Sequence, residues 1–181
     1  MKHLFYRDKH ITLLSDTHAK HRDLNIPPTD VIVHCGDACN GGNLEELIDF
    51  FSWFSELPAI YKIFVPGNHD LIFDLEPELA KNLVPENIIL LENSGCLIED
   101  ILFHSVVARP WLHSLPEFPQ QSIDFLLTHG PAFSILDQET GCKLLYDYVK
   151  SVQPVYHIFG HIHETSGQEV TKNGICFMNV G

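Results

Sequence analysis

The sequence predicts an α/β fold in which buried strands are covered by helices. Apolar runs rich in Ile, Val, Leu and Phe recur along the chain, with turn residues between them. The runs are continuous rather than alternating, which is typical of strands buried on both faces of a sheet. They cover residues 10–16, 30–37, 59–68, 87–92, 101–110, 122–130, 154–163 and 174–181.

Segments with helical spacing separate these strands. Residues 43–57 carry an apolar side chain every three or four positions, and Asn43 is placed to cap the helix. Further helices are expected over 140–152 and, more briefly, over 75–83. The first half of the chain therefore has the order strand, connection, strand, helix, strand. This order is the pattern of parallel α/β units. The second half is richer in strands and is expected to close with a hairpin whose turn is Lys172-Asn173-Gly174.

Composition limits the classes of protein that fit. The chain has 181 residues and no linker, repeat or low-complexity segment, so we expect one domain over residues 1–181. The formal net charge is −13, with 11 Lys and Arg against 24 Asp and Glu, and the basic residues are not clustered. Such a chain is a poor partner for duplex nucleic acid or for an anionic membrane surface.

The sequence also predicts a cytoplasmic protein. It has no apolar run of about 18 residues that could cross a membrane, and its N-terminus lacks the pattern of a secretory signal. Five cysteines at irregular spacing, without a C-x-x-C pair, argue against a disulfide framework. The sequence gives no indication of an oligomeric state.

Polar residues gather where five of the predicted strands end. They are Asp16 with His18, then Asp37, then Asn68 with His69 and Asp70, then His129, and finally His161 with His163. In open α/β sheets, ligands bind outside the carboxyl ends of the strands. We therefore expect these side chains to lie in one crevice.

This set of side chains indicates a pair of divalent metal ions. Carboxylate oxygen, amide oxygen and imidazole nitrogen suit manganese, iron, zinc or nickel. Seven candidate ligands are too many for one tetrahedral zinc, but they suffice for two ions if one carboxylate bridges them. Two such ions activate water for attack at phosphorus.

Simpler interpretations compete with this one. Each motif alone is more often a turn or a helix cap than a ligand site. His34, His104 and His157 lie inside apolar runs and are expected to pack in the core. Cys35 and Cys39 flank Asp37 and are expected to be small packing residues, although thiolates also bind zinc. The coincidence of suitable chemistry at five separate strand ends favours a site.

Five short sequence blocks, taken in the order in which they occur along the chain, resemble the calcineurin-like metallophosphoesterase superfamily. They are Asp16-x-His18, Gly36-Asp37, Gly67-Asn68-His69-Asp70, Thr128-His129-Gly130 and Gly160-His161-x-His163. The segments SDTHAKH, IVHCGD, PGNHD, LLTHGP and HIFGHIHE are most similar to the small metallophosphatase-domain-containing branch. The resemblance runs from about residue 11 to the C-terminus, and it implies a four-layer α/β/β/α sandwich with metals at the strand ends.

The resemblance also implies a role for each matching residue. Asp16, His18 and His163 would hold one metal, Asn68, His129 and His161 would hold the second, and Asp37 would bridge the two. His69 would be the catalytic histidine that meets the phosphate and the leaving oxygen, and Asp70 would orient it. The expected reaction is attack on phosphorus by a metal-bridging hydroxide, with manganese favoured.

The expected substrates are small phosphodiesters, for two reasons. An acidic surface disfavours long nucleic acids, and the resembled branch is associated with cyclic nucleotides. Arg109 is expected to offer a free guanidinium near the site, and His21, between Lys20 and Arg22, is expected to line its entrance. Ala108-Arg109-Pro110-Trp111 stands where the branch usually has Gly-Ser-Pro-Trp, and the short segment 111–122 implies a reduced pocket wall.

Two other functions remain open at this stage. A shallow site would also suit a phosphomonoesterase or a protein phosphatase. A non-catalytic protein-binding scaffold on the same fold is the alternative from another class, although it predicts eroded ligands and a missing catalytic histidine.

Overall fold

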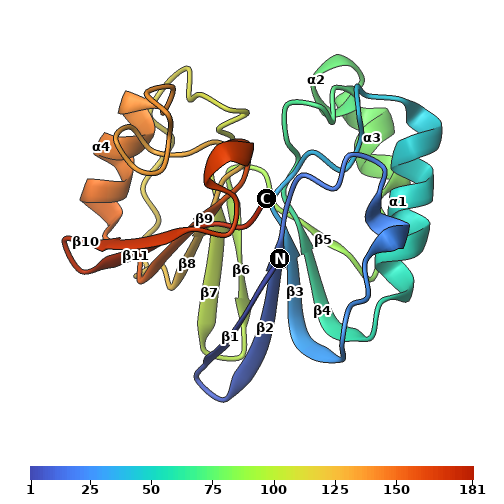
Figure 1. Cartoon of the computed structure of the whole chain (residues 1–181), viewed down its shortest axis with the longest axis horizontal. Helices are drawn as coiled ribbons and strands as arrows, with labels where there is room; N and C mark the ends of the chain where they lie inside the picture. Colours follow the sequence, from blue (N-terminus) through green and yellow to red (C-terminus); the bar gives the residue numbers. More distant parts are fainter.

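The computed structural model describes residues 1–181 and contains two mixed sheets that pack face to face (Figure 1). The first sheet has the order β1-β2-β3-β4-β5, and its strands are parallel except for β1. Its strands are β1 (Lys2–Tyr6), β2 (Lys9–Leu14), β3 (Thr29–His34), β4 (Ala59–Phe64) and β5 (Ile89–Leu90).

The second sheet has the order β10-β11-β9-β8-β7-β6. Its four central strands are parallel, and each edge strand is antiparallel to its neighbour. Its strands are β6 (Ser94–Ile98), β7 (Ile101–Ser105), β8 (Phe125–Leu127), β9 (Tyr156–Phe159), β10 (Glu169–Lys172) and β11 (Ile175–Asn179).

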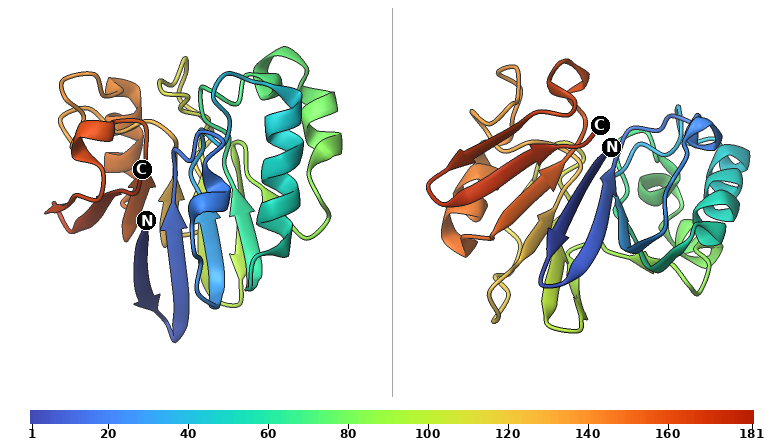
Figure 2. Two further views of the ribbon diagram at one scale, coloured as in Figure 1. Left: turned by 45° about the vertical axis from the view of Figure 1, so that its right-hand side comes forward. Right: turned by 60° about the horizontal axis from the view of Figure 1, so that its bottom comes forward.

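Helices cover the outer face of each sheet (Figure 2). On the first sheet lie α1 (Leu44–Glu56), α2 (Ile72–Leu75) and α3 (Pro77–Leu83), and on the second lies α4 (Lys143–Val152). Three apolar clusters of similar size, with 16, 15 and 14 buried residues, fill the space between the sheets and beneath the two helical layers. Three cores need four layers around them, so the predicted α/β/β/α sandwich is confirmed.

The helices follow the local signals with two differences. The Asn43 side chain accepts a hydrogen bond from the Glu45 amide and caps α1 as predicted. The helix expected over 75–83 is instead the pair α2 and α3, which is interrupted before Pro77, a residue with no amide hydrogen to continue the first helix. The helix expected from residue 140 begins at Lys143, where the Cys142 sulfur accepts from the Leu145 amide.

Two strands were not predicted, β1 and β6. Both are edge strands with alternating burial, so neither forms a continuous apolar run. The turn before β2 uses Arg7 and Asp8 with left-handed φ of 44° and 63°, which lacks the usual Asn-Gly signal. The predicted hairpin at Asn173 and Gly174 is confirmed by the pairing of β10 with β11.

The parallel strands of both sheets bring their carboxyl ends to one end of the sandwich. The loops after β2, β3 and β4 meet there with the loops after β8 and β9, at the top of Figure 1. None of the helices combines the length and apolar character needed to cross a bilayer.

Two of the histidines predicted to pack in the core are fully buried. His34 and His157 have no exposed surface. His157 Nε2 lies 2.8 Å from the Thr128 hydroxyl, which donates its own proton to the Gly130 carbonyl, so the imidazole donates from Nε2. Its Nδ1 has no partner. The third, His104, is half-buried.

The burial of His157 predicts a fold that weakens in acid. Burial lowers the pKa of His157 to about 3, whereas histidine in an unfolded chain titrates near 6.5. Because the folded-state pKa is depressed, the unfolded chain takes up the proton first. Stability is therefore complete above about pH 6.5 and falls towards pH 3, by up to about 1.4 kcal/mol per pH unit for this group.

Urea unfolding of chelator-treated protein at about pH 7.5 and about pH 5.5 measures this effect. We expect the wild type to lose about 1.4 kcal/mol more than His157→Leu between these conditions. His113→Leu, which removes an exposed histidine, should behave like the wild type. Equal losses in wild type and His157→Leu would show that the buried imidazole takes up its proton in the folded protein as readily as in the unfolded chain.

Candidate metal centre

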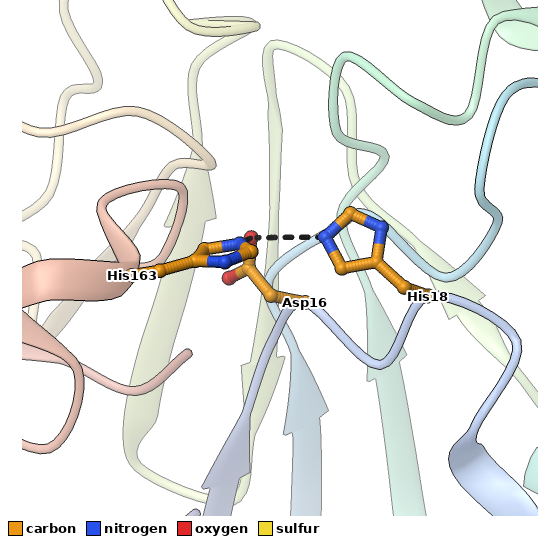
Figure 3. Close-up of side chains that lie close together, drawn as sticks. All are labelled: Asp16, His18 and His163. Carbon is orange, nitrogen blue, oxygen red and sulfur yellow. Dashed lines mark ion pairs between the residues drawn. The ribbon is translucent and has the colours of Figure 1, made fainter.

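Asp16, His18 and His163 form a first cluster of metal-capable side chains (Figure 3). Asp16 Oδ1 lies 4.0 Å from His18 Nε2 and 3.6 Å from His163 Nε2. One ligand atom from each residue lies within 4.8 Å of the others. Asp16 and His18 come from the loop after β2, and His163 begins a short 3₁₀ helix, η2 (His163–Thr165), after β9.

Asp37, His129 and His161 form a second cluster, which is more deeply buried. His129 is fully buried, and its Nε2 lies 3.2 Å from Asp37 Oδ2 without forming a hydrogen bond. The buried Oδ1 of Asn68 is also without a partner. Unpaired buried polar atoms are costly, so two of them at predicted ligand positions are consistent with a cation-binding function.

Asp37 lies between the two clusters. Its Oδ2 is 3.9 Å from His18 Nε2 in the first cluster and 3.2 Å from His129 Nε2 in the second. Its Oδ1 accepts a hydrogen bond of 2.8 Å from the His69 amide. One carboxylate therefore faces both sets of ligands while its other oxygen is held by the backbone.

Three imidazoles at this site share one arrangement, which sequence reasoning missed. The Nδ1 of His18 lies 3.2 Å from the Cys39 carbonyl, and that of His129 lies 2.8 Å from the Cys35 carbonyl. The Nδ1 of His69 likewise contacts the Asn40 carbonyl. In a neutral imidazole, donation from Nδ1 to a carbonyl leaves the Nε2 lone pair free, which is the tautomer that His18 and His129 need in order to bind a metal.

The backbone at the centre is strained. Asp16, His18, Asp37 and His161 have left-handed φ values of 56°, 41°, 56° and 68°, a conformation that costs of order 1 kcal/mol or more in residues other than glycine. Gly67 permits a close approach, because a Cβ there would lie 2.2 Å from Asp37 Oδ1. A Cβ on Gly160 would lie 2.1 Å from Asp16 Oδ2.

Charge couples Asp37 and His129. Burial alone would oppose the charged form of each group, but their mutual attraction outweighs it, lowering the pKa of Asp37 to about 2 and raising the pKa of His129 to about 9. Burial and the neighbouring His129 lower the pKa of His161, so that imidazole is neutral near pH 7. A cation bound by Asp37 and His129 must therefore displace one proton.

Comparison with known proteins identifies the family. The sequence pattern of the calcineurin-like phosphoesterases matches residues 9–165. The chain belongs to the calcineurin-like phosphoesterase family. The matched range contains both metal-capable clusters, and the family resemblance drawn from the five sequence blocks is confirmed.

Relatives of this chain include longer proteins. UPF0046 protein K07C11.7 of Caenorhabditis elegans is 32% identical over 194 residues, covering 91% of this chain and 66% of the relative. Metallophosphoesterase domain-containing protein 1 of Homo sapiens is 32% identical over 197 residues, covering 85% of this chain and 60% of the relative. The chain thus spans less than two thirds of the length of these relatives.

A solved structure supports the fold of this chain. The phosphopantetheinyl hydrolase of Mycobacterium tuberculosis superposes with a TM-score of 0.68 over 93% of this chain and 87% of that one. The two share 13% sequence identity, so the similarity shows the fold alone. Members of the family generally use a dinuclear centre of divalent metals, and the two clusters of this chain fit that arrangement.

Asp70 does not orient His69, contrary to the expectation from the sequence. The fully buried Asp70 carboxylate accepts hydrogen bonds from the backbone amides of Asp37, Cys39 and Gly67, at 2.8–3.0 Å. His69 is oriented instead by the Asn40 carbonyl. Asp70 therefore joins the loops after β3 and β4. Burial raises the pKa of Asp70 to about 6, so the carboxylate is ionised at neutral pH.

Replacing Asp70 should destabilise the protein even without metals. Asp70→Ala leaves three buried amides unpaired, and each costs about 1–3 kcal/mol. We expect urea unfolding of chelator-treated protein to show a loss of at least about 3 kcal/mol. Asp147→Ala, which removes an exposed carboxylate on α4, is the control. A loss for Asp70→Ala no larger than the control's would contradict this role.

His21 and Arg109 are not free to bind substrate, contrary to expectation. The His21 ring is fully buried against Phe50 and Trp53, and its Nε2 contacts Asp49 at 3.0 Å. The Arg109 side chain is only 6% exposed, and its guanidinium is already paired with carboxylates. Their positions in the sequence predicted that both residues lie near the site. The sequence could not show that carboxylates already pair with them.

Asn179 supports the metal centre indirectly, and sequence reasoning did not identify it. Its buried Nδ2 donates to the Ile162 carbonyl at 2.7 Å and to the Thr165 hydroxyl at 2.8 Å. These bonds hold η2, which carries His163. No local motif marks Asn179, because it ends β11 whereas its partners lie in the loop after β9. Cys35 and Cys39 are buried packing residues, as predicted.

Proposed function

We propose that residues 1–181 form one catalytic domain that hydrolyses small phosphodiesters with two divalent cations, manganese being favoured. Asp16, His18 and His163 would hold one cation, and Asn68, His129 and His161 the other, with Asp37 shared between them. The position of Asp37 Oδ2, within 4 Å of His18 Nε2 and of His129 Nε2, carries this proposal. No other carboxylate oxygen has this relation to both clusters.

The bound cations would supply an activated water and neutralise the phosphoryl oxygens. The chain supplies the proton for the leaving group. His69 donates from Nδ1 to the Asn40 carbonyl, and its ring lies 5.0 Å, edge to face, from that of His18. The ring is therefore beside the first cluster, and as an imidazolium it would carry a second proton on Nε2 that can pass to the leaving oxygen, the role of a general acid.

The charge distribution favours a small substrate. The formal net charge of −13 repels long polyanions. The arginines and several lysines are already paired with carboxylates, including Arg7 with Asp124, Arg22 with Asp49 and Lys9 with Glu99. Substrate attraction must then come from the bound cations themselves. Cyclic nucleotides are compact phosphodiesters and are the first natural class to test.

Hydrolysis of bis-p-nitrophenyl phosphate by chelator-treated protein, titrated with Mn²⁺, tests the proposal. p-Nitrophenyl phosphate in parallel separates diester from monoester preference. We expect activity to return with Mn²⁺ and to be greater on the diester, after which cyclic nucleotides are screened. Greater activity on the monoester would make the protein a phosphomonoesterase. Inactivity on both esters with Mn²⁺ shown to be bound would support the non-catalytic scaffold.

A further inference from the structure

Arg109 connects the two halves of the sandwich beside the candidate metal centre. It follows β7 in the second sheet, but its side chain contacts residues attached to the first sheet. Nη1 donates to Asp74 Oδ1 at 3.0 Å, and Nη2 pairs with Glu92 Oε1. The guanidinium carbon also lies 6.0 Å from the centre of the Phe73 ring.

The partners of Arg109 are tied to the loop that carries Asn68 and His69. Phe73 and Asp74 belong to α2, which directly follows that loop. The Phe73 amide donates to the Asp70 carbonyl at 3.0 Å, so the first turn of α2 is bonded to the last residue of the motif. A displacement of α2 would therefore be transmitted to His69.

The backbone around Arg109 is tied to the loop that carries His129. The Gly130 amide donates to the Ala108 carbonyl at 2.9 Å. A Cβ on Gly130 would lie 2.2 Å from the Pro110 carbonyl oxygen, so no other residue could allow this contact without displacement. The segment 108–110 thus rests directly on the residue after His129.

We propose that Arg109 is a positioning residue that fixes His129 relative to Asn68 and His69. This inference rests on the proposed function, because the distance between His129 and the loop of Asn68 and His69 matters only if the two loops share a metal centre. A guanidinium suits the task, since its separate nitrogens reach two carboxylates while its face covers an aromatic ring. Lysine has a single ammonium group and could not maintain both contacts.

Arg109→Met tests the proposal, because methionine keeps an apolar side chain against Phe73 and removes both ion pairs. We expect kcat on bis-p-nitrophenyl phosphate at saturating Mn²⁺ to fall by about 10²-fold, with KM changed by less than about twofold. Asp74→Asn, a milder variant at a half-exposed position, should lower kcat in the same way but less. Arg22→Met removes an exposed arginine paired with Asp49 and should match the wild type.

Electron paramagnetic resonance of the manganese-loaded proteins provides a readout independent of turnover. We expect the magnetic coupling between the two manganese ions to change in Arg109→Met and Asp74→Asn and to be unchanged in Arg22→Met. This comparison still decides the role of Arg109 if the wild type hydrolyses no ester, an outcome that would overturn only the proposed function.

Two results would overturn the positioning role. A raised KM with unchanged kcat would mean that Arg109 binds substrate. A less stable Arg109→Met protein whose kcat, KM and manganese coupling equal those of the wild type, at a temperature where it is fully folded, would mean that the ion pairs only stabilise the fold.

Discussion

Asp37→Asn should prevent the protein from binding two divalent cations. Replacing a residue that only orients a ligand costs about 10–100-fold in metal affinity, so loss of a carboxylate shared by both cations should cost more than about 100-fold. We expect equilibrium dialysis against Mn²⁺, followed by elemental analysis, to give two ions per wild-type chain and fewer in the variant. Metal-dependent hydrolysis should fall with occupancy.

The choice of asparagine separates metal binding from folding. Asp37 Oδ1 accepts from the His69 amide, and the asparagine carbonyl can still do so. Only the charge and the lone pair of Oδ2, which faces His18 and His129, are lost. Asp49→Asn removes a carboxylate that pairs with His21 and Arg22 and serves as the control. Two tightly bound ions in Asp37→Asn would exclude a shared carboxylate.

His69→Ala should keep both cations and lose most of the activity. His69 lies in neither ligand cluster, so metal stoichiometry should match the wild type. A positioned general acid contributes about 10²–10⁴-fold. The loss should be smallest for bis-p-nitrophenyl phosphate, whose leaving group needs little protonation, and larger for an ester with an ordinary alkoxide leaving group.

The comparison of two leaving groups makes this prediction specific. A purely structural effect of His69→Ala would slow both substrates equally. His113→Ala, which removes an exposed histidine in the segment 111–122, should leave both rates unchanged. An equal loss on the two esters, or loss of a metal ion, would rule out His69 as the proton donor.

Most of the centre could be predicted because its residues follow strands. A continuous apolar run fixes where a parallel strand ends, and parallel strands of one sheet deliver those ends to the same edge. Asp16, Asp37 and His129 were located in this way, and the structure places Asp16 in the first cluster and Asp37 with His129 in the second. The four layers followed from the family resemblance rather than from the spacing.

The remaining features depend on contacts between distant segments. Asp70 was expected to orient its neighbour His69, but three amides from two loops satisfy its carboxylate. His21 was expected to line the site entrance, but Asp49 pairs with it. Arg109 was expected to offer a free guanidinium near the site, but Asp74 and Glu92 pair with it. Such partners cannot be read from local sequence. The edge strands β1 and β6 were missed because exposed side chains alternate with partly buried ones along them.

A crystal structure of the manganese-loaded protein, with anomalous scattering used to locate the metals, tests the shared role of Asp37 most directly. We expect two manganese peaks roughly 3.5–4 Å apart, as in two-metal sites generally. One should lie among Asp16, His18 and His163, the other among Asn68, His129 and His161, with Asp37 coordinating both. A single peak, or two peaks of which only one contacts Asp37, would contradict a dinuclear centre built on this carboxylate.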